Sequence, residues 1–111
     1  MMEEKSTPVL RRRKKALLRR LPELHAVLRG SLIERYKRCG VPGCRCAQGP
    51  GHGPKHYLSV SQSGATPQMD YVPQDYVVQV TQYLENYHQA KQILDEICAI
   101  NRELLRRRER L

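Results

Sequence analysis

The 111-residue sequence contains no tryptophan and no phenylalanine, and its six aromatic residues are all tyrosines. A chain of this length buries a smaller share of its surface on folding than a larger domain does, so it has little stability to spare. We therefore expect a single compact domain whose fold is supported by a bound metal, by a partner chain, or by both.

Long apolar runs are also missing. No stretch approaches the length of a membrane span, and the N-terminus lacks the apolar segment of a signal peptide. We expect a cytoplasmic protein, where cysteine thiols stay reduced and can bind a metal.

Acidic residues are scarce. The chain has 11 of them against 20 lysines and arginines, which gives a net charge of +9 and an isoelectric point near 9.8. A charge of this size indicates a polyanionic partner. Nucleic acid, with DNA preferred, is the expected partner, and acidic membrane lipid is a much weaker alternative.

The basic residues are clustered. One run, Arg11–Lys15, has almost no neighbouring acids, and a second group near the C-terminus contains Arg106, Arg107, Arg108 and Arg110. A run of this kind can be no more than a solvated helix face, but its lack of balancing acids favours contacts with phosphate groups. The predicted nucleic-acid-binding residues are Arg11, Arg12, Arg13, Lys14, Lys15, Arg19, Arg20, Lys37, Arg38, Arg45 and Lys55.

Three of the four cysteines lie close together. Cys39, Cys44 and Cys46 are followed by His52 in the spacing C-x4-C-x-C-x5-H. In an extended segment residues two apart point to the same side, so Cys44 and Cys46 can direct their sulfurs to one point. Five of the seven glycines lie in residues 37–57, where they permit the tight turns that tetrahedral zinc coordination needs.

Other roles for these cysteines fit less well. A disulfide between Cys44 and Cys46 would close a small, strained ring, and the C-x-x-C spacing typical of redox pairs is absent. We predict a structural Zn²⁺ bound by Cys39, Cys44, Cys46 and His52. His56 is the alternative fourth ligand.

Several short segments occur in a distinctive order. Residues 28–32 (Leu-Arg-Gly-Ser-Leu) precede the cysteine motif, and His52-Gly53-Pro54, Tyr71-Val72-Pro73 and Asn86-Tyr87 follow it. In this order they resemble a family of short bacterial proteins of uncharacterised function, whose shared signature is CG-x-PGC-x-C followed by HGP. The resemblance covers residues 28–105 and implies no particular activity, although it suggests a link with mobile genetic elements. The sequence departs from it at Lys55-His56, where the family tends to have aromatic residues.

The N-terminal segment has a helical pattern. We expect a helix with Thr7 as its N-cap and Pro8 in its first turn. Five leucines follow on one face, and Pro22 is expected to open a second short helix that ends at Gly30. These leucines are Leu10, Leu17, Leu21, Leu24 and Leu28.

Strands are predicted at residues 31–38, 56–61 and 68–72, with a hairpin turn at Ser63-Gly64. In the second strand the alternation predicts that His56, Leu58 and Val60 share one face. Tyr36 and Tyr57, close to the cysteine motif, are the tyrosines best placed to contact nucleic acid, and the alternative is that each packs on its sheet. Pro73 should end the last strand.

From Gln74 onward the sequence predicts one long helix with a heptad pattern that indicates coiled-coil pairing. Ile93 and Ile100 widen its apolar face, which leaves room for the N-terminal leucine helix beside it, and Cys98 is expected to be buried. The predicted dimerisation residues are Val80, Tyr83, Tyr87, Leu94, Ile97, Asn101 and Leu104.

The predicted fold is α+β: a basic helical arm (residues 1–30), a zinc-stapled hairpin module resembling a zinc ribbon (31–73) and a dimerisation helix (74–111). A fully ligated zinc has no open position for activating water, and no catalytic triad or deaminase motif occurs, so we expect no enzymatic activity. We expect a homodimeric, zinc-binding, nucleic-acid-binding accessory or regulatory protein. The alternative is an adaptor that docks through its helices on a larger recombinase-type protein.

Overall fold

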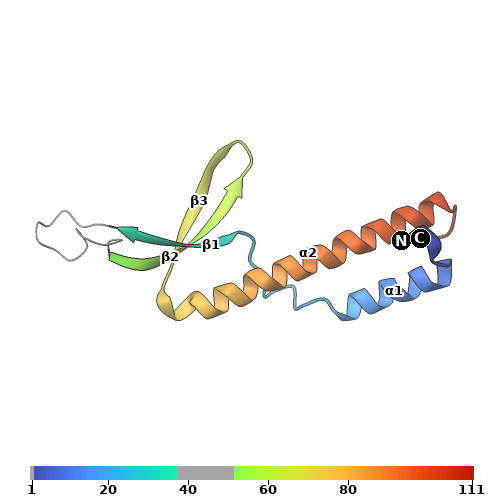
Figure 1. Cartoon of the computed structure of the whole chain (residues 1–111), viewed down its shortest axis with the longest axis horizontal. Helices are drawn as coiled ribbons and strands as arrows, with labels where there is room; N and C mark the ends of the chain where they lie inside the picture. Colours follow the sequence, from blue (N-terminus) through green and yellow to red (C-terminus); the bar gives the residue numbers. More distant parts are fainter. Residues whose placement is uncertain (1, 38–51) are drawn as a thin grey trace, which may run out of the picture. The chain divides into compact units, whose positions relative to one another are not determined.

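A computed structural model describes residues 2–37 and 52–111 (Figure 1). Its N-terminal helix, three-stranded antiparallel sheet and long C-terminal helix confirm the predicted α+β class. The chain divides into two units. The helical unit comprises Met1–Val27 and Glu85–Leu111, the sheet unit comprises Leu28–Leu84, and helix α2 contributes residues to both.

Helix α1 spans Thr7–Arg19 and follows a short 3₁₀ turn, η1, at Met2–Glu4. The N-cap is Ser6 and not Thr7 as predicted, because the Ser6 hydroxyl accepts a hydrogen bond from the Val9 N–H at 3.4 Å. This bond satisfies one of the free N–H groups at the helix start. The helix ends at Arg19, three residues before Pro22, and the Arg20 N–H bonds back to the Leu17 carbonyl.

The predicted second helix is wrong. Residues 21–30 contain a single turn, closed by a hydrogen bond from the Ala26 N–H to the Glu23 carbonyl at 3.0 Å. Pro22 disfavours helical geometry at the preceding residue, and Leu24 is exposed, so burial does not offset the cost of starting a short helix. Gly30 has φ +139°, and a Cβ there would lie 2.7 Å from the Ser59 carbonyl oxygen. Glycine at this position therefore allows the backbone to pass close to the strand that contains Ser59.

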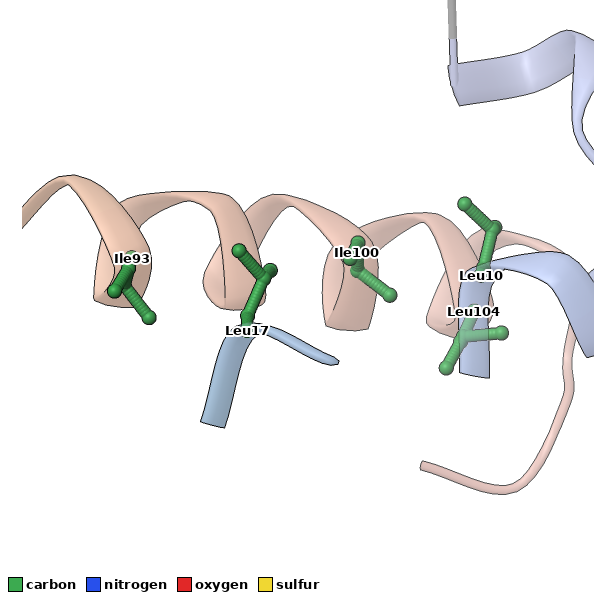
Figure 2. Close-up of a cluster of buried hydrophobic side chains, with 5 residues drawn as sticks. All are labelled: Leu10, Leu17, Ile93, Ile100 and Leu104. Carbon is green, nitrogen blue, oxygen red and sulfur yellow. The ribbon is translucent and has the colours of Figure 1, made fainter. Parts of the chain in front are cut away.

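Helix α2 spans Val77–Arg106 and follows Pro73 and a 3₁₀ turn, η3, at Gln74–Tyr76. In the helical unit it packs against α1 through one apolar cluster, of which Figure 2 shows five members: Leu10, Leu17, Ile93, Ile100 and Leu104. The residues from α2 recur at steps of seven and four, so they lie on one side of the helix. The partner of this stripe is therefore the leucine stripe of α1 in the same chain.

The contact with α1 covers some of the predicted dimerisation residues of α2 and leaves others exposed. Leu104 lies in the core cluster and Ile97 packs against it, whereas Leu94 is 52% exposed. The prediction that Cys98 is buried is wrong, because its side chain is exposed. Cys98 precedes buried Ile100 by two positions, and residues two apart lie about 200° apart around a helix.

The sheet consists of β1 (Ser31–Lys37), β2 (His52–Gln62) and β3 (Ala65–Val72) in the order β1-β2-β3. The turn at Ser63-Gly64 joins β2 to β3 as predicted, and Gly64 has φ +69°. Both β2 and β3 begin earlier than predicted, and the added residues include Pro54 in β2 and Pro67 in β3.

Register shifts accommodate both prolines. The β1–β2 register changes between Arg35 and Lys37, so that Gly53 and Pro54 together face Tyr36. The β2–β3 register changes between Val60 and Gln62, so that Thr66 and Pro67 together face Ser61. Bulges leave a backbone N–H outside the ladder, which is where a residue without an N–H costs least.

The two faces of the sheet differ in burial. His56, Leu58 and Val72 are buried and lie on one face, as the alternation predicted for β2 requires. Gly30 approaches the same face, since a Cβ there would lie 3.1 Å from Leu58 Cδ1. The sheet therefore has one packed face and one face open to solvent.

Substitutions at two adjacent leucines of α1 test the packing of the core cluster. Leu17 is 1% exposed and Leu18 is 57% exposed. We expect Leu17→Ala to lower the free energy of unfolding by about 3 kcal/mol, because it removes buried methyl groups and leaves a cavity. Leu18→Ala is the matched control and should change it by less than about 0.5 kcal/mol. Urea denaturation followed by circular dichroism measures both, and equal effects of the two variants would contradict the assigned packing.

Candidate nucleic-acid interface and metal ligands

The outward side of α1 carries exposed cations. Arg12, Lys15 and Arg19 lie on the side opposite Leu10 and Leu17, and all three are exposed. Within residues 2–37 and 52–111 these three side chains form no salt bridge. We call them the basic face. Because no acid neutralises them, their charge is available to an anionic partner.

Other predicted cations of α1 have partners inside the helical unit. Arg13 donates two hydrogen bonds to Glu96 of α2, one of them from Nη2 to Oε1 at 3.0 Å. These bonds hold the pKa of Glu96 below its ordinary value and raise that of Arg13. Arg11 donates to the Arg110 carbonyl at 2.8 Å. Arg13 in particular is committed to fastening α1 to α2, which makes it a poor candidate for contacting phosphate.

The C-terminal basic group also contains both cations that pair within the helical unit and cations that remain exposed. Glu103 is buried and accepts hydrogen bonds from Arg107 at 2.8 Å and Arg106 at 3.0 Å. The bond from Arg107 is the main reason that the pKa of Glu103 lies below its ordinary value. Arg107 also donates to the Thr7 hydroxyl at 3.2 Å. It therefore joins the two helix ends, while Arg108 and Arg110 remain exposed.

The solvent face of the sheet presents two tyrosines and two cations. Arg35, Lys55, Tyr57 and Tyr71 lie on the face opposite the buried His56 and Leu58, and we call these four residues the tyrosine face. The Tyr57 and Tyr71 rings meet edge to face with their centroids 5.7 Å apart. The Arg35 guanidinium lies over the Tyr57 ring, 5.9 Å from its centre. This face thus combines cations with aromatic surface.

The sequence identified Lys55 and Tyr57 as candidates and missed Arg35 and Tyr71. Tyr36, the other tyrosine proposed for nucleic-acid contact, is exposed but follows the alternation of the opposite face. Tyr71 joins Tyr57 because the two residues are register partners. That pairing depends on the bulge at Ser61, and local sequence patterns offer no means of placing such a bulge.

Most of the predicted metal ligands lie outside the described residues. Cys39, Cys44 and Cys46 do so, as do the predicted nucleic-acid-binding residues Arg38 and Arg45. Lys37 and His52 are described as strand positions only, and they are register partners at the ends of β1 and β2. The sheet therefore holds the two ends of the cysteine segment next to each other.

The alternative ligand, His56, lies within the sheet. It is buried, and its Nε2 lies 3.4 Å from Oε1 of Glu34 on β1. Among residues 2–37 and 52–111 no group of three His, Cys, Asp or Glu side chains could hold a metal, but the three clustered cysteines fall outside that range. The Nε2 atom of His56 thus faces a carboxylate inside the sheet.

None of the described helices combines the length and apolarity needed to cross a membrane.

Comparison with known proteins places the chain in a family. A protein-family model described as "Domain of unknown function (DUF6788)" matches residues 8–82, from the first turn of α1 into the start of α2. The chain belongs to this family. The match begins earlier than the resemblance read from the motifs and ends before most of α2, but it includes both the basic face and the tyrosine face. No curated protein and no solved structure matches the chain.

Proposed function

We propose that this protein is a small, cytoplasmic, zinc-binding accessory or regulatory protein that binds nucleic acid, with DNA as the preferred form, mainly through the phosphate backbone. The observation that carries this proposal is the basic face of α1. It presents three exposed cations that no acid in the described chain neutralises, on a protein with a net charge of +9. The proposal includes no catalytic step.

The distribution of ion pairs supports binding at this face. Arg13 and Arg107 take part in packing the helical unit together, and the acids that neutralise them, Glu96 and Glu103, lie on α2. The cations on the far side of α1 serve no such purpose. Clusters of this kind attract phosphates by displacing counterions, without reading sequence.

The proposed zinc ion would be held by Cys39, Cys44, Cys46 and His52. The β1–β2 pairing supports this ligand set, because the register pair Lys37 and His52 brings together the chain on both sides of the cysteines. A loop whose ends are already fixed loses less conformational entropy when its ligands gather around a metal. Bound there, zinc would act structurally, as a closed tetrahedral site does.

Metal content tests the zinc site directly. We expect one zinc per purified chain by elemental analysis, and no bound zinc in Cys44→Ser, because three protein ligands are too few for a closed structural site. Cys98→Ser is the matched control, since Cys98 is exposed on α2, and it should retain the metal. A wild-type protein without zinc, or a Cys44→Ser variant that keeps it, would contradict the site.

Salt-dependent binding tests the basic face. The variant Arg12→Gln/Arg19→Gln should bind nucleic acid more weakly, and its slope of log affinity against log salt should be shallower by about 0.7–0.9 for each phosphate that it no longer neutralises. The control Lys91→Gln/Arg102→Gln removes two exposed charges from α2 and should retain the wild-type slope. Anisotropy titrations from 50 to 200 mM salt, about the range over which such interactions weaken, provide the measurement. Equal effects of the two double variants would place binding elsewhere.

A second candidate, an adaptor for a larger recombinase-type protein, is favoured by exposed apolar surface on the helical unit. Leu24, Val27, Tyr87 and Leu94 are among the residues that line a groove on the helical unit. Leu94 and Leu24 are 52% and 62% exposed. The nucleic-acid-binding protein is proposed to be a homodimer in which a second copy of the chain covers Tyr87 and Leu94. In the adaptor a different protein covers them.

Light scattering coupled to size exclusion separates these two candidates. We expect a symmetric dimer, and we expect Leu94→Gln to shift it toward monomer, because the variant places an amide where an apolar side chain should be covered. Leu18→Gln, an equally exposed leucine on α1, is the control and should leave the dimer intact. A folded wild-type monomer would rule out self-association through this seam and favour the adaptor.

A further inference from the structure

We infer that the tyrosine face of the sheet binds unpaired nucleobases, so that the nucleic acid this protein prefers is single-stranded. This inference rests on the proposed nucleic-acid binding and specifies its ligand. Four residues carry it, namely Arg35, Lys55, Tyr57 and Tyr71.

These residues occupy adjacent rows on one face of the sheet. Tyr57 on β2 is the register partner of Tyr71 on β3 and of Ile33 on β1, which gives a row across all three strands. Lys55 and Arg35 are partners in the next row. A pair of tyrosine rings beside a cationic row matches a polynucleotide strand, in which bases and phosphates run side by side.

The two rings differ in burial in a way that suits binding. Tyr57 is half-buried between its neighbours and is fixed by the edge-to-face contact with Tyr71 and by Arg35 above it. Tyr71 lies on an edge strand and is 57% exposed. Tyr71 thus offers ring surface in a fixed orientation. When a base stacks on it, the side chain loses little additional conformational entropy.

Acidic side chains are segregated from this face. In the sheet, Glu34 alternates to the opposite face, where it meets His56, and Asp70 is the partner of Leu58 on that face as well. The strand positions whose side chains are described thus place both carboxylates on one face and Arg35 and Lys55 on the other. Such separation favours an anionic ligand at the tyrosines over a neutral protein surface.

The geometry selects unpaired bases. In a duplex the base faces are covered by their neighbours, and only base edges and phosphates are accessible. Stacking on a protein ring requires a base that has left its stack, and each such contact is sequence-tolerant and worth about 1–3 kcal/mol. The basic face accepts phosphates from either form, so discrimination between them comes from the tyrosines.

The test compares three ligands of equal length by fluorescence anisotropy: a labelled oligothymidylate, a duplex, and a strand of abasic sugar-phosphate units. Full-length protein should bind the oligothymidylate about 10-fold or more tightly than the abasic strand at equal salt. Tyr71→Leu should weaken oligothymidylate binding about 10-fold and leave abasic binding unchanged, whereas Tyr71→Phe should retain the affinity because it keeps the ring.

Tyr76→Leu is the matched control, since Tyr76 is 55% exposed in the sheet unit but lies outside the tyrosine face, and it should bind as the wild type does. Equal affinity for the base-bearing and abasic strands, or full affinity in Tyr71→Leu, would overturn the inference while leaving backbone binding through the basic face intact. Binding to the duplex alone would overturn it too. Binding to none of the three ligands would overturn the proposed function together with the inference.

Discussion

The apolar contact between α1 and α2 determines which charges of this protein face solvent. Leu10 and Leu17 fix the rotation of α1 about its axis, because both must lie against Ile93, Ile100 and Leu104. Once that rotation is fixed, Arg13 lies beside Glu96, and Arg12 and Arg19 point away from α2. A run of consecutive cations is thereby sorted into residues that hold the helices together and residues that are free to bind. Packing, more than charge count, defines the basic face.

The bulge between β2 and β3 has a comparable role in the sheet. A two-residue turn at Ser63-Gly64 with an unbroken ladder would pair Tyr71 with His56, on the packed side. The extra residue opposite Ser61 shifts the pairing by one, so that Tyr71 meets Tyr57 on the solvent side. A one-residue slip moves every side chain of a strand to the other face. Pro67, which lies in the bulge, is thus linked to the position of a tyrosine four residues away.

The same residues show how far the sequence could predict the structure. The leucine spacing predicted α1, the strand alternation predicted that His56 and Leu58 share a face, and Pro73 marked the end of β3. These features depend on local periodicity, which is visible in a single sequence. The bulges, the exposure of Cys98 and the absence of a helix after Pro22 depend on tertiary packing and register, which periodicity does not contain.

In the candidate site, too, some features could be predicted from the sequence and others could not. The abundance of cations could be read from the sequence, but their pairing could not, since Arg13 and Glu96 are 83 residues apart and meet only after the helices pack. The heptad interpretation of α2 likewise took no account of tertiary packing. It placed Leu104 and Leu94 in one seam, whereas the structure buries the first against α1 and exposes the second. Because α1 competes for the apolar side of α2, the pattern alone cannot tell which neighbour covers it.

The exposure of Tyr71 supports the proposal that the sheet binds a ligand. A chain without phenylalanine or tryptophan has few large side chains with which to stabilise a core, and burying one typically contributes about 1.5–3 kcal/mol. The buried residues of the sheet are nonetheless aliphatic or histidine, while Tyr71 remains mostly in solvent beside Tyr57 and the cations. A stability requirement alone would favour turning that ring inward. Its exposure costs a small protein stability, and recognition of a ligand with flat, unstacked rings and negative charge would offset that cost.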